Sequence, residues 1–135
     1  MSHEKYIRQI ALPQVGHAGQ EKLGRSRVLV VGAGGLGNAV LPYLASAGIG
    51  SIGVIDGDRV SLSNLHRQVL FAESDIGELK AAVACKKLSK QFPEITLIPY
   101  NDFLSGENAL TLFAEYDIIL DATDAIDIRY LINDA

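Results

Sequence analysis

A short stretch in the middle of the chain gathers side chains whose chemistry suits a polyphosphate. Asp56 and Asp58 are followed by Asn64 and Arg67, and Lys80 comes a little later. A guanidinium binds phosphate oxygens as a two-pronged donor and an ammonium binds them as a point charge. The carboxylate of Asp56 falls where it can take the hydroxyls of a ribose. These residues predict a nucleotide site, and a hydride-transfer site would need no such cluster.

A glycine-rich segment precedes this cluster. The segment 32–37 reads Gly-Ala-Gly-Gly-Leu-Gly, it follows the apolar run 27–31, and a second apolar run at 51–55 leads into Asp56. This layout is typical of a nucleotide-binding βαβ unit. Phosphate would lie against free backbone N–H groups at the positive end of a helix dipole. Four glycines are predicted to shape this phosphate-binding loop. Gly32 turns the chain out of the strand, Gly34 and Gly35 admit the phosphate, and Gly37 lets the helix pack closely on the sheet.

The elements that must position these residues alternate between strand and helix. We predict strands at 27–31, 51–55, 95–100 and 117–121, and helices at about 14–24, 36–47, 64–69, 78–91 and 105–116. Pro42 should kink its helix. Ser105 is expected to cap the helix that follows it, and Thr123 or Asp124 to cap a last one. The alternation predicts an α/β fold with a Rossmann-like, doubly wound parallel sheet in the order 3-2-1-4.

Composition limits the class of protein. The 135 residues are 48% hydrophobic and 21% charged, as expected for one globular domain over 1–135 that begins with a helical segment at about 1–25. The net charge of −4 gives no reason to expect nucleic acid or an anionic membrane as a partner. No secretion signal or membrane span is visible, so we expect a cytoplasmic protein. The single cysteine, Cys85, is interpreted as a buried packing residue.

The last predicted strand raises a question about the extent of the domain. Residues 117–121 read as a buried strand, yet no later segment can pair with the outer side of that strand. A bare apolar edge promotes aggregation. We therefore expect the chain to be the N-terminal half of a larger domain, with the sheet apparently truncated.

Several motifs in order along the chain resemble one family. They are Tyr6-Ile7-Arg8-Gln9, the glycine-rich segment 32–37, Asp56-Gly57-Asp58, Ser63-Asn64-Leu65-His66-Arg67-Gln68, Gly77 with Lys80, and Asp121-Ala122-Thr123-Asp124. Together they resemble the ThiF/MoeB/HesA family, the bacterial relatives of ubiquitin-activating enzymes. The resemblance covers essentially the whole chain, and the Ser-Asn-Leu-x-Arg-Gln element is the most specific part of it.

The resemblance implies adenylation of a carboxylate. ATP and Mg²⁺ bind at the glycine-rich loop, and the C-terminal glycine carboxylate of a ubiquitin-like sulfur-carrier protein attacks the α-phosphate, in molybdopterin or thiamine biosynthesis. By the same resemblance Asp56 holds the ribose, Asn64, Arg67 and Lys80 line the triphosphate, and Asp124 helps to hold Mg²⁺. Arg8 would reach the phosphates of a neighbouring subunit's ATP, which implies a homodimer.

Two departures from the family pattern leave alternatives open. Ala125 stands where the family usually has asparagine, and the family's second half, with its usual CxxC zinc ligands, is absent, so no zinc site is expected in this segment. An NAD-binding oxidoreductase remains the alternative that the glycine loop and Asp56 allow. A third reading is a catalytically incompetent fragment of the adenylyltransferase.

Overall fold

The computed structural model describes residues 4–123 and 131–134. Four parallel strands form one sheet in the order β3-β2-β1-β4. The strands are β1 (Arg27–Val31), β2 (Ser51–Ile55), β3 (Thr96–Tyr100) and β4 (Ile118–Asp121). The α/β class, the parallel sheet and the strand order predicted from the sequence are therefore confirmed.

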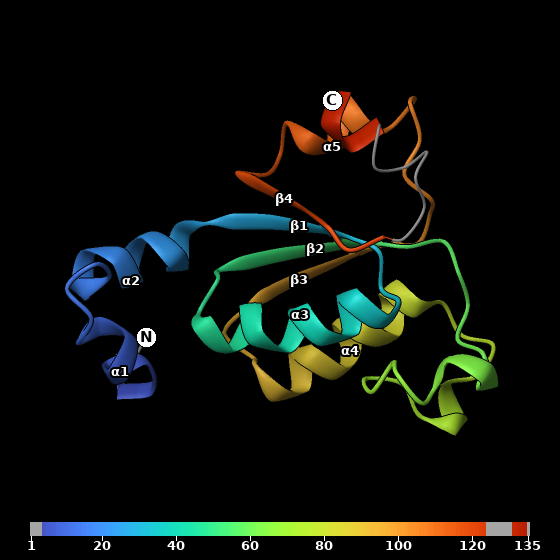
Figure 1. The fold of residues 1–135 in the computed structure, drawn as a ribbon, viewed down its shortest axis with the longest axis horizontal. Helices are drawn as coiled ribbons and strands as arrows, with labels where there is room; N and C mark the ends of the chain where they lie inside the picture. Colours follow the sequence, from blue (N-terminus) through green and yellow to red (C-terminus); the bar gives the residue numbers. More distant parts are fainter. Residues whose placement is uncertain (1–3, 124–130, 135) are drawn as a thin grey trace.

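Helices cover both faces of the sheet (Figure 1). The elements outside the sheet are η1 (Glu4–Tyr6), α1 (Ile7–Ile10), α2 (Gly16–Arg25), α3 (Gly35–Ala47), η2 (Leu62–Asn64), η3 (Glu73–Asp75), α4 (Lys80–Gln91) and α5 (Ala109–Phe113). Helices α3 and α4 lie on one face, whereas α5 and the helical residues 131–134 lie on the other. This two-sided covering is the doubly wound arrangement.

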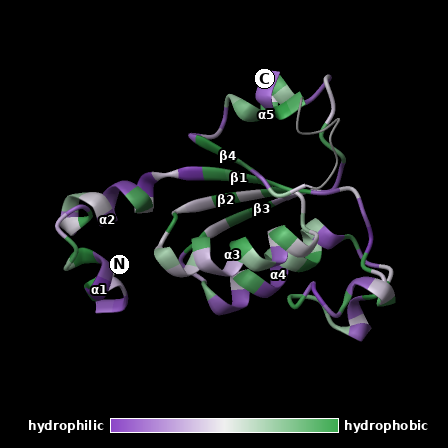
Figure 2. Ribbon diagram, viewed as in Figure 1, coloured by the Kyte–Doolittle hydropathy of each residue, from purple (hydrophilic) through white to green (hydrophobic). Residues whose placement is uncertain are grey.

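The alternation of side chains along each strand divides the core into two clusters. Val28 and Val30 of β1 point into the larger cluster, against α3 and α4, while Leu29 and Val31 point into the smaller one, against α5. Figure 2 shows hydrophobic residues along β1 and β4 and in the helices that lie against the two faces of the sheet. Cys85 is buried in the larger cluster, as expected of a packing residue.

The edges of the sheet are less buried than its centre. β4 lies at one edge, and Ile118 in it is 51% exposed.

None of the helices in the described part of the chain has the length and apolar character needed to span a membrane.

Three of the predicted helices differ from the structure. No helix forms at 64–69, because the η2 turn and further turns fill that stretch. The helix expected from 78 begins at Lys80, because residues 77–79 pair with Arg59 and Val60 instead. The helix expected at 105–116 is reduced to α5, and Asn108 rather than Ser105 precedes it. The Asn108 side chain accepts a hydrogen bond from the Ser105 amide (2.8 Å).

Candidate nucleotide site

The glycine-rich loop joins β1 to α3 in the way that the sequence predicts. Gly32 has a φ of +104°, which favours glycine, and its amide donates to the carbonyl oxygen of Ile55 at the end of β2 (2.9 Å). A Cβ at Gly37 would collide with the carbonyl oxygen of Gly32, so this glycine lets α3 begin close to the strand. Gly34 and Gly35 are left at the mouth of a pocket, at the N-terminus of the helix.

Asp56, at the end of β2, is tied to this loop. Its Oδ2 accepts a hydrogen bond of 2.7 Å from the amide of Ala33, and its Oδ1 accepts one of 2.7 Å from the amide of Asp58. The carboxylate is only partly buried and faces the pocket. Each carboxylate oxygen has a second lone pair, so Asp56 can still accept hydrogen bonds from a ligand's hydroxyls.

A second polar residue holds the loop from the helix side. Asn38 in α3 is 1% exposed, and its Nδ2 donates to the carbonyl oxygens of Ala33 (2.8 Å) and Gly34 (3.0 Å). Its Oδ1 accepts from the amide of Leu70 (2.8 Å). One buried amide therefore connects the glycine-rich loop to the segment that carries Asn64 and Arg67.

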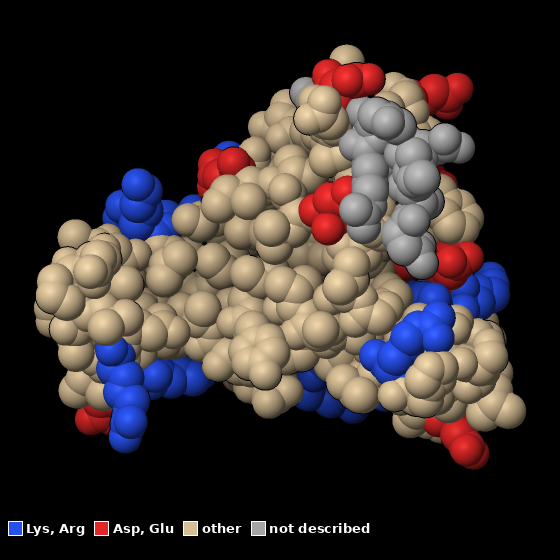
Figure 3. Space-filling model, in the orientation of Figure 1, with Lys and Arg blue, Asp and Glu red and all other residues tan. Residues whose placement is uncertain are grey.

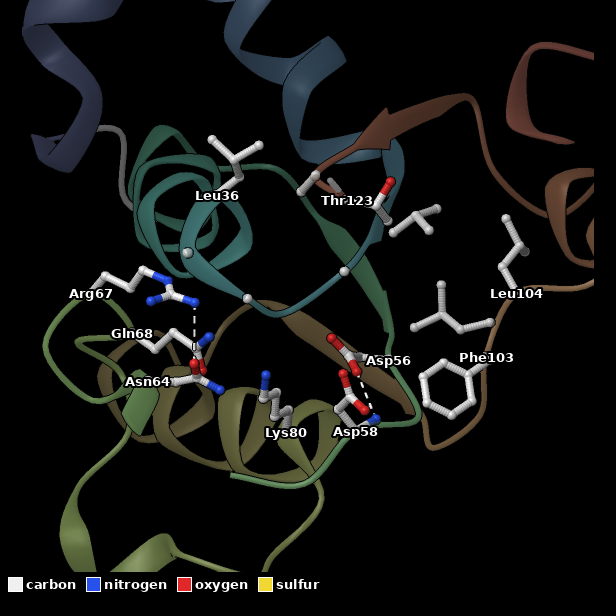
Figure 4. Close-up of a pocket in the computed structure, with 16 residues that line it drawn as sticks. Leu36, Asp56, Asp58, Asn64, Arg67, Gln68, Lys80, Phe103, Leu104 and Thr123 are labelled. Atoms are coloured by element: carbon white, nitrogen blue, oxygen red, sulfur yellow. Dashed lines mark hydrogen bonds between the residues drawn. The ribbon is translucent and has the colours of Figure 1, made fainter. Parts of the chain in front are cut away.

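The pocket at the carboxyl ends of the strands has a volume of about 680 Å³. Figure 4 shows that it has two different ends. Asn64, Arg67 and Lys80 lie on one side of Asp56 and Asp58, and the apolar side chains of Phe103 and Leu104 lie on the other. The crevice outside the carboxyl ends of parallel strands is where open α/β sheets bind ligands.

The polar end of the pocket carries two cationic side chains, Arg67 and Lys80. Arg67 donates to Oδ1 of Asn64 (3.1 Å), and Asn64 in turn donates to Oγ of Ser61 (2.9 Å). Lys80, at the start of α4, is only 5% exposed. Among the described residues no carboxylate forms an ion pair with Arg67 or Lys80. Such a pair of cations beside a helix N-terminus is suited to a phosphate chain.

Most of the predicted site residues meet in this pocket. Its walls include Gly32, Gly34, Gly35, Asp56, Asp58, Asn64, Arg67 and Lys80. Gly37 packs behind the loop instead, and Asp124 lies outside the described residues.

Arg8 does not line this pocket. It lies in α1, which the Gln9 side chain joins to the carbonyl oxygen of Ala47 at the far end of α3 (3.1 Å). At about 1.5 Å per residue, a helix of 13 residues separates this end from the glycine-rich loop by roughly 20 Å. Arg8 is therefore remote from the pocket of its own chain (Figure 1).

Several residues of the site were not predicted from the sequence. Gln68, Phe103 and Leu104 line the pocket, and Asn38 supports the loop. An amide side chain in the otherwise apolar first turns of α3 was a signal for Asn38. Phe103 and Leu104 follow β3, so the rule that ligands bind beyond the carboxyl ends of strands pointed to them.

The fold, with its pocket at the carboxyl ends of the parallel strands, defines an α/β protein of the Rossmann type. The sequence profile of the ThiF family matches residues 6–135. The chain belongs to the ThiF family.

Curated relatives agree with the assignment to this family. The chain is 52% identical over 132 residues to a sulfur carrier protein adenylyltransferase of Thermus thermophilus, and the match covers 98% of this chain and 49% of the relative. It is 47% identical over 130 residues to the adenylyltransferase and sulfurtransferase MOCS3 of Xenopus laevis, covering 96% of this chain and 29% of the relative. The chain thus spans half or less of the length of these curated relatives.

A solved structure shares the fold and holds a nucleotide. The tRNA N6-threonylcarbamoyladenosine dehydratase TcdA of E. coli, in complex with ATP, superposes with a TM-score of 0.82 at 27% identity, over 92% of this chain and 51% of that one.

Proposed function

We propose that the whole protein uses ATP to adenylate the C-terminal glycine carboxylate of a ubiquitin-like sulfur-carrier protein, in molybdopterin or thiamine biosynthesis in the cytoplasm. The observation that carries this proposal is the pocket in which Arg67 and Lys80 lie across Asp56 from an apolar end, neither of them paired with an acid in the part of the chain that the structure describes. The 52% identity to a sulfur carrier protein adenylyltransferase supports the choice of substrate.

In this reaction an oxygen of the carrier's carboxylate forms a bond to the α-phosphorus of ATP. The bond from the α-phosphorus to the bridging oxygen breaks, and pyrophosphate leaves with the electron pair. The protein's part is to hold the groups in line and to neutralise charge. Arg67 and Lys80 would bind the phosphate oxygens, with Asn64 as a third donor. Asp56 would accept hydrogen bonds from the ribose hydroxyls.

Mg²⁺ belongs to the same proposal. Mg²⁺ bound to the phosphates would neutralise part of their charge. The family resemblance assigns the ion to Asp124. We expect Asp124→Ala to abolish pyrophosphate exchange. EDTA should also abolish exchange by the unmodified protein. Added Mg²⁺ should restore exchange to the EDTA-treated protein but not to Asp124→Ala.

We further propose that the protein is a homodimer in which Arg8 serves the partner's pocket. Arg8 and the pocket lie at opposite ends of α3, so Arg8 can contact nucleotide only in another copy. Helix α3 has no charged residue, and Leu36 and Tyr43 on it are 55% and 78% exposed. In Figure 3 the surface over the middle of the molecule is correspondingly poor in charge.

Carrier-dependent exchange of ³²P-labelled pyrophosphate into ATP tests the function. We expect exchange that requires ATP, Mg²⁺ and a carrier ending in glycine, and that is lost in Arg67→Ala. Arg59→Ala is the control, because Arg59 is exposed and donates to the carbonyl oxygen of Gly77, away from the pocket. Calorimetric titration separates the alternative: NAD binding more tightly than ATP would indicate an oxidoreductase and overturn the proposal.

A further inference from the structure

The apolar end of the pocket contains one aromatic side chain with a large free surface. Phe103 is 57% exposed, whereas its neighbour Leu104 is 5% exposed and packed in the smaller core cluster. Both follow β3, and both line the pocket. Other exposed apolar residues of the chain, such as Leu110 on α5, are not among those that line it.

Hydrogen bonds hold both the amide and the carbonyl group of Phe103. The amide of Phe103 donates to Oδ1 of Asp102 (2.8 Å), and its carbonyl oxygen accepts from Nδ2 of Asn108 (3.0 Å). The buried Leu104 anchors the next position in the core. The backbone that carries the ring is therefore set by the protein and needs no ligand to order it.

The ring of Phe103 lies directly against the backbone of Gly57. A Cβ at Gly57 would stand 2.5–2.8 Å from three adjacent ring atoms of Phe103, Cγ, Cδ2 and Cε2. The φ of Gly57 is not positive, so the backbone does not itself demand glycine at this position. Because of this close approach, any side chain at position 57 would have to displace the ring from its present place.

We infer that the Phe103 ring, held on Gly57, is the surface on which the base of the nucleotide stacks. This inference rests on the proposed function. If the phosphates lie between the glycine-rich loop and the cations, and the ribose lies at Asp56, the base extends to the far side of Asp56, where Figure 4 places Phe103. An aromatic ring stacks on any base, so Phe103 contributes affinity for the base and not the choice between adenine and guanine.

Titration of two ligands tests this assignment. Stacking on an aromatic side chain corresponds to an effect of roughly 5- to 100-fold in affinity. We expect Phe103→Ala to weaken ATP binding by that factor and to leave the binding of inorganic tripolyphosphate, which has no base, within about twofold. Phe103→Tyr should retain ATP binding. Leu110→Ala, on an exposed apolar residue away from the pocket, is the matched control.

A double-mutant cycle tests the role of Gly57. Gly57→Ala should displace the ring and weaken ATP binding without changing any group that contacts ligand. If Gly57 acts only through the ring, Gly57→Ala combined with Phe103→Ala should bind ATP no more weakly than Phe103→Ala alone.

Fluorescence gives a measurement that does not depend on truncating the ring. The chain has no tryptophan, so Phe103→Trp creates a single reporter. Its emission should change when ATP is added and stay constant with tripolyphosphate, whereas Leu110→Trp should respond to neither.

Three results would overturn the inference. They are wild-type affinity for ATP in Phe103→Ala, an equal loss for ATP and tripolyphosphate, and no ATP response in Phe103→Trp. Failure of the unmodified protein to bind ATP would instead remove the proposed function, and this inference with it.

Discussion

The amide nitrogen of Ala33 donates a hydrogen bond of 2.7 Å to Oδ2 of Asp56. The two residues follow neighbouring parallel strands, β1 and β2, and Ala33 is fully buried. The carboxylate assigned to the ribose therefore also satisfies a buried donor of the glycine-rich loop. Substitutions at Asp56 will act on the loop and on the ligand together.

The first prediction concerns this double role. Asp56→Ala should weaken ATP binding at least about 10-fold and lower the free energy of unfolding by about 1–3 kcal/mol, because the Ala33 amide loses its partner. Calorimetric titration and urea unfolding measure the two effects. Glu107→Ala, on an exposed acid, should change neither quantity. A loss of affinity with unchanged stability would show that the Ala33 contact is unimportant.

The second prediction separates binding from stability at Lys80. Lys80 as a whole is 5% exposed, and its ammonium lines the pocket with no acidic partner among the described residues, which opposes folding. Lys80→Met should therefore raise the free energy of unfolding without nucleotide by roughly 1 kcal/mol. It should also weaken ATP binding by about 10- to 100-fold.

Lys86→Met, on the exposed side of the same helix, is the control for Lys80 and should alter neither quantity appreciably. A clear drop in stability in Lys80→Met would mean that the ammonium stabilises the free protein.

The third prediction concerns the buried amide of Asn38. Asn38→Ala removes three hydrogen bonds and leaves the Leu70 amide without its acceptor, so the free energy of unfolding should fall by about 2–4 kcal/mol. Urea unfolding measures it, with Asn101→Ala at an exposed position as the comparison. Equal stability of the two variants would contradict the role given to Asn38.

The fourth prediction concerns the thiol of Cys85. Burial raises the pKa of Cys85 to about 12, so the reactive thiolate is scarce at pH 8. Iodoacetamide should leave the folded protein unmodified at this pH and alkylate it once in 6 M guanidinium, as followed by mass spectrometry. Because the pKa is higher in the folded state, the thiol's contribution to stability should be lost as the pH rises from about 9 towards 12. Rapid alkylation of the folded protein would show an accessible thiol.

The sequence predicted those parts of the fold that depend on local pattern. The runs 27–31 and 51–55 were placed without error, because apolar β-branched residues bounded by glycines specify a buried strand. The segment 59–79 was not placed correctly, because its conformation depends on contacts between residues that are far apart in the sequence. Val60 exchanges backbone hydrogen bonds with Gly77 and Glu78, and no periodicity signals such a pairing.

The same distinction holds for the site. The sequence led to Asp56, Asn64, Arg67 and Lys80 because their polar or charged groups and their spacing are visible in it. Phe103 was not, since an isolated phenylalanine in a loop has no pattern of its own, and its place beside Gly57 exists only after β2 and β3 have paired.

The three hydrogen bonds of Asn38 bear on the kinetics of binding. They fix the glycine-rich loop and the residues up to Leu70 before any nucleotide arrives, so the entropy of ordering these segments is lost during folding and not during binding. Association should then be a single bimolecular step whose observed rate rises linearly with nucleotide concentration. It should lack the plateau that a slow loop closure would impose.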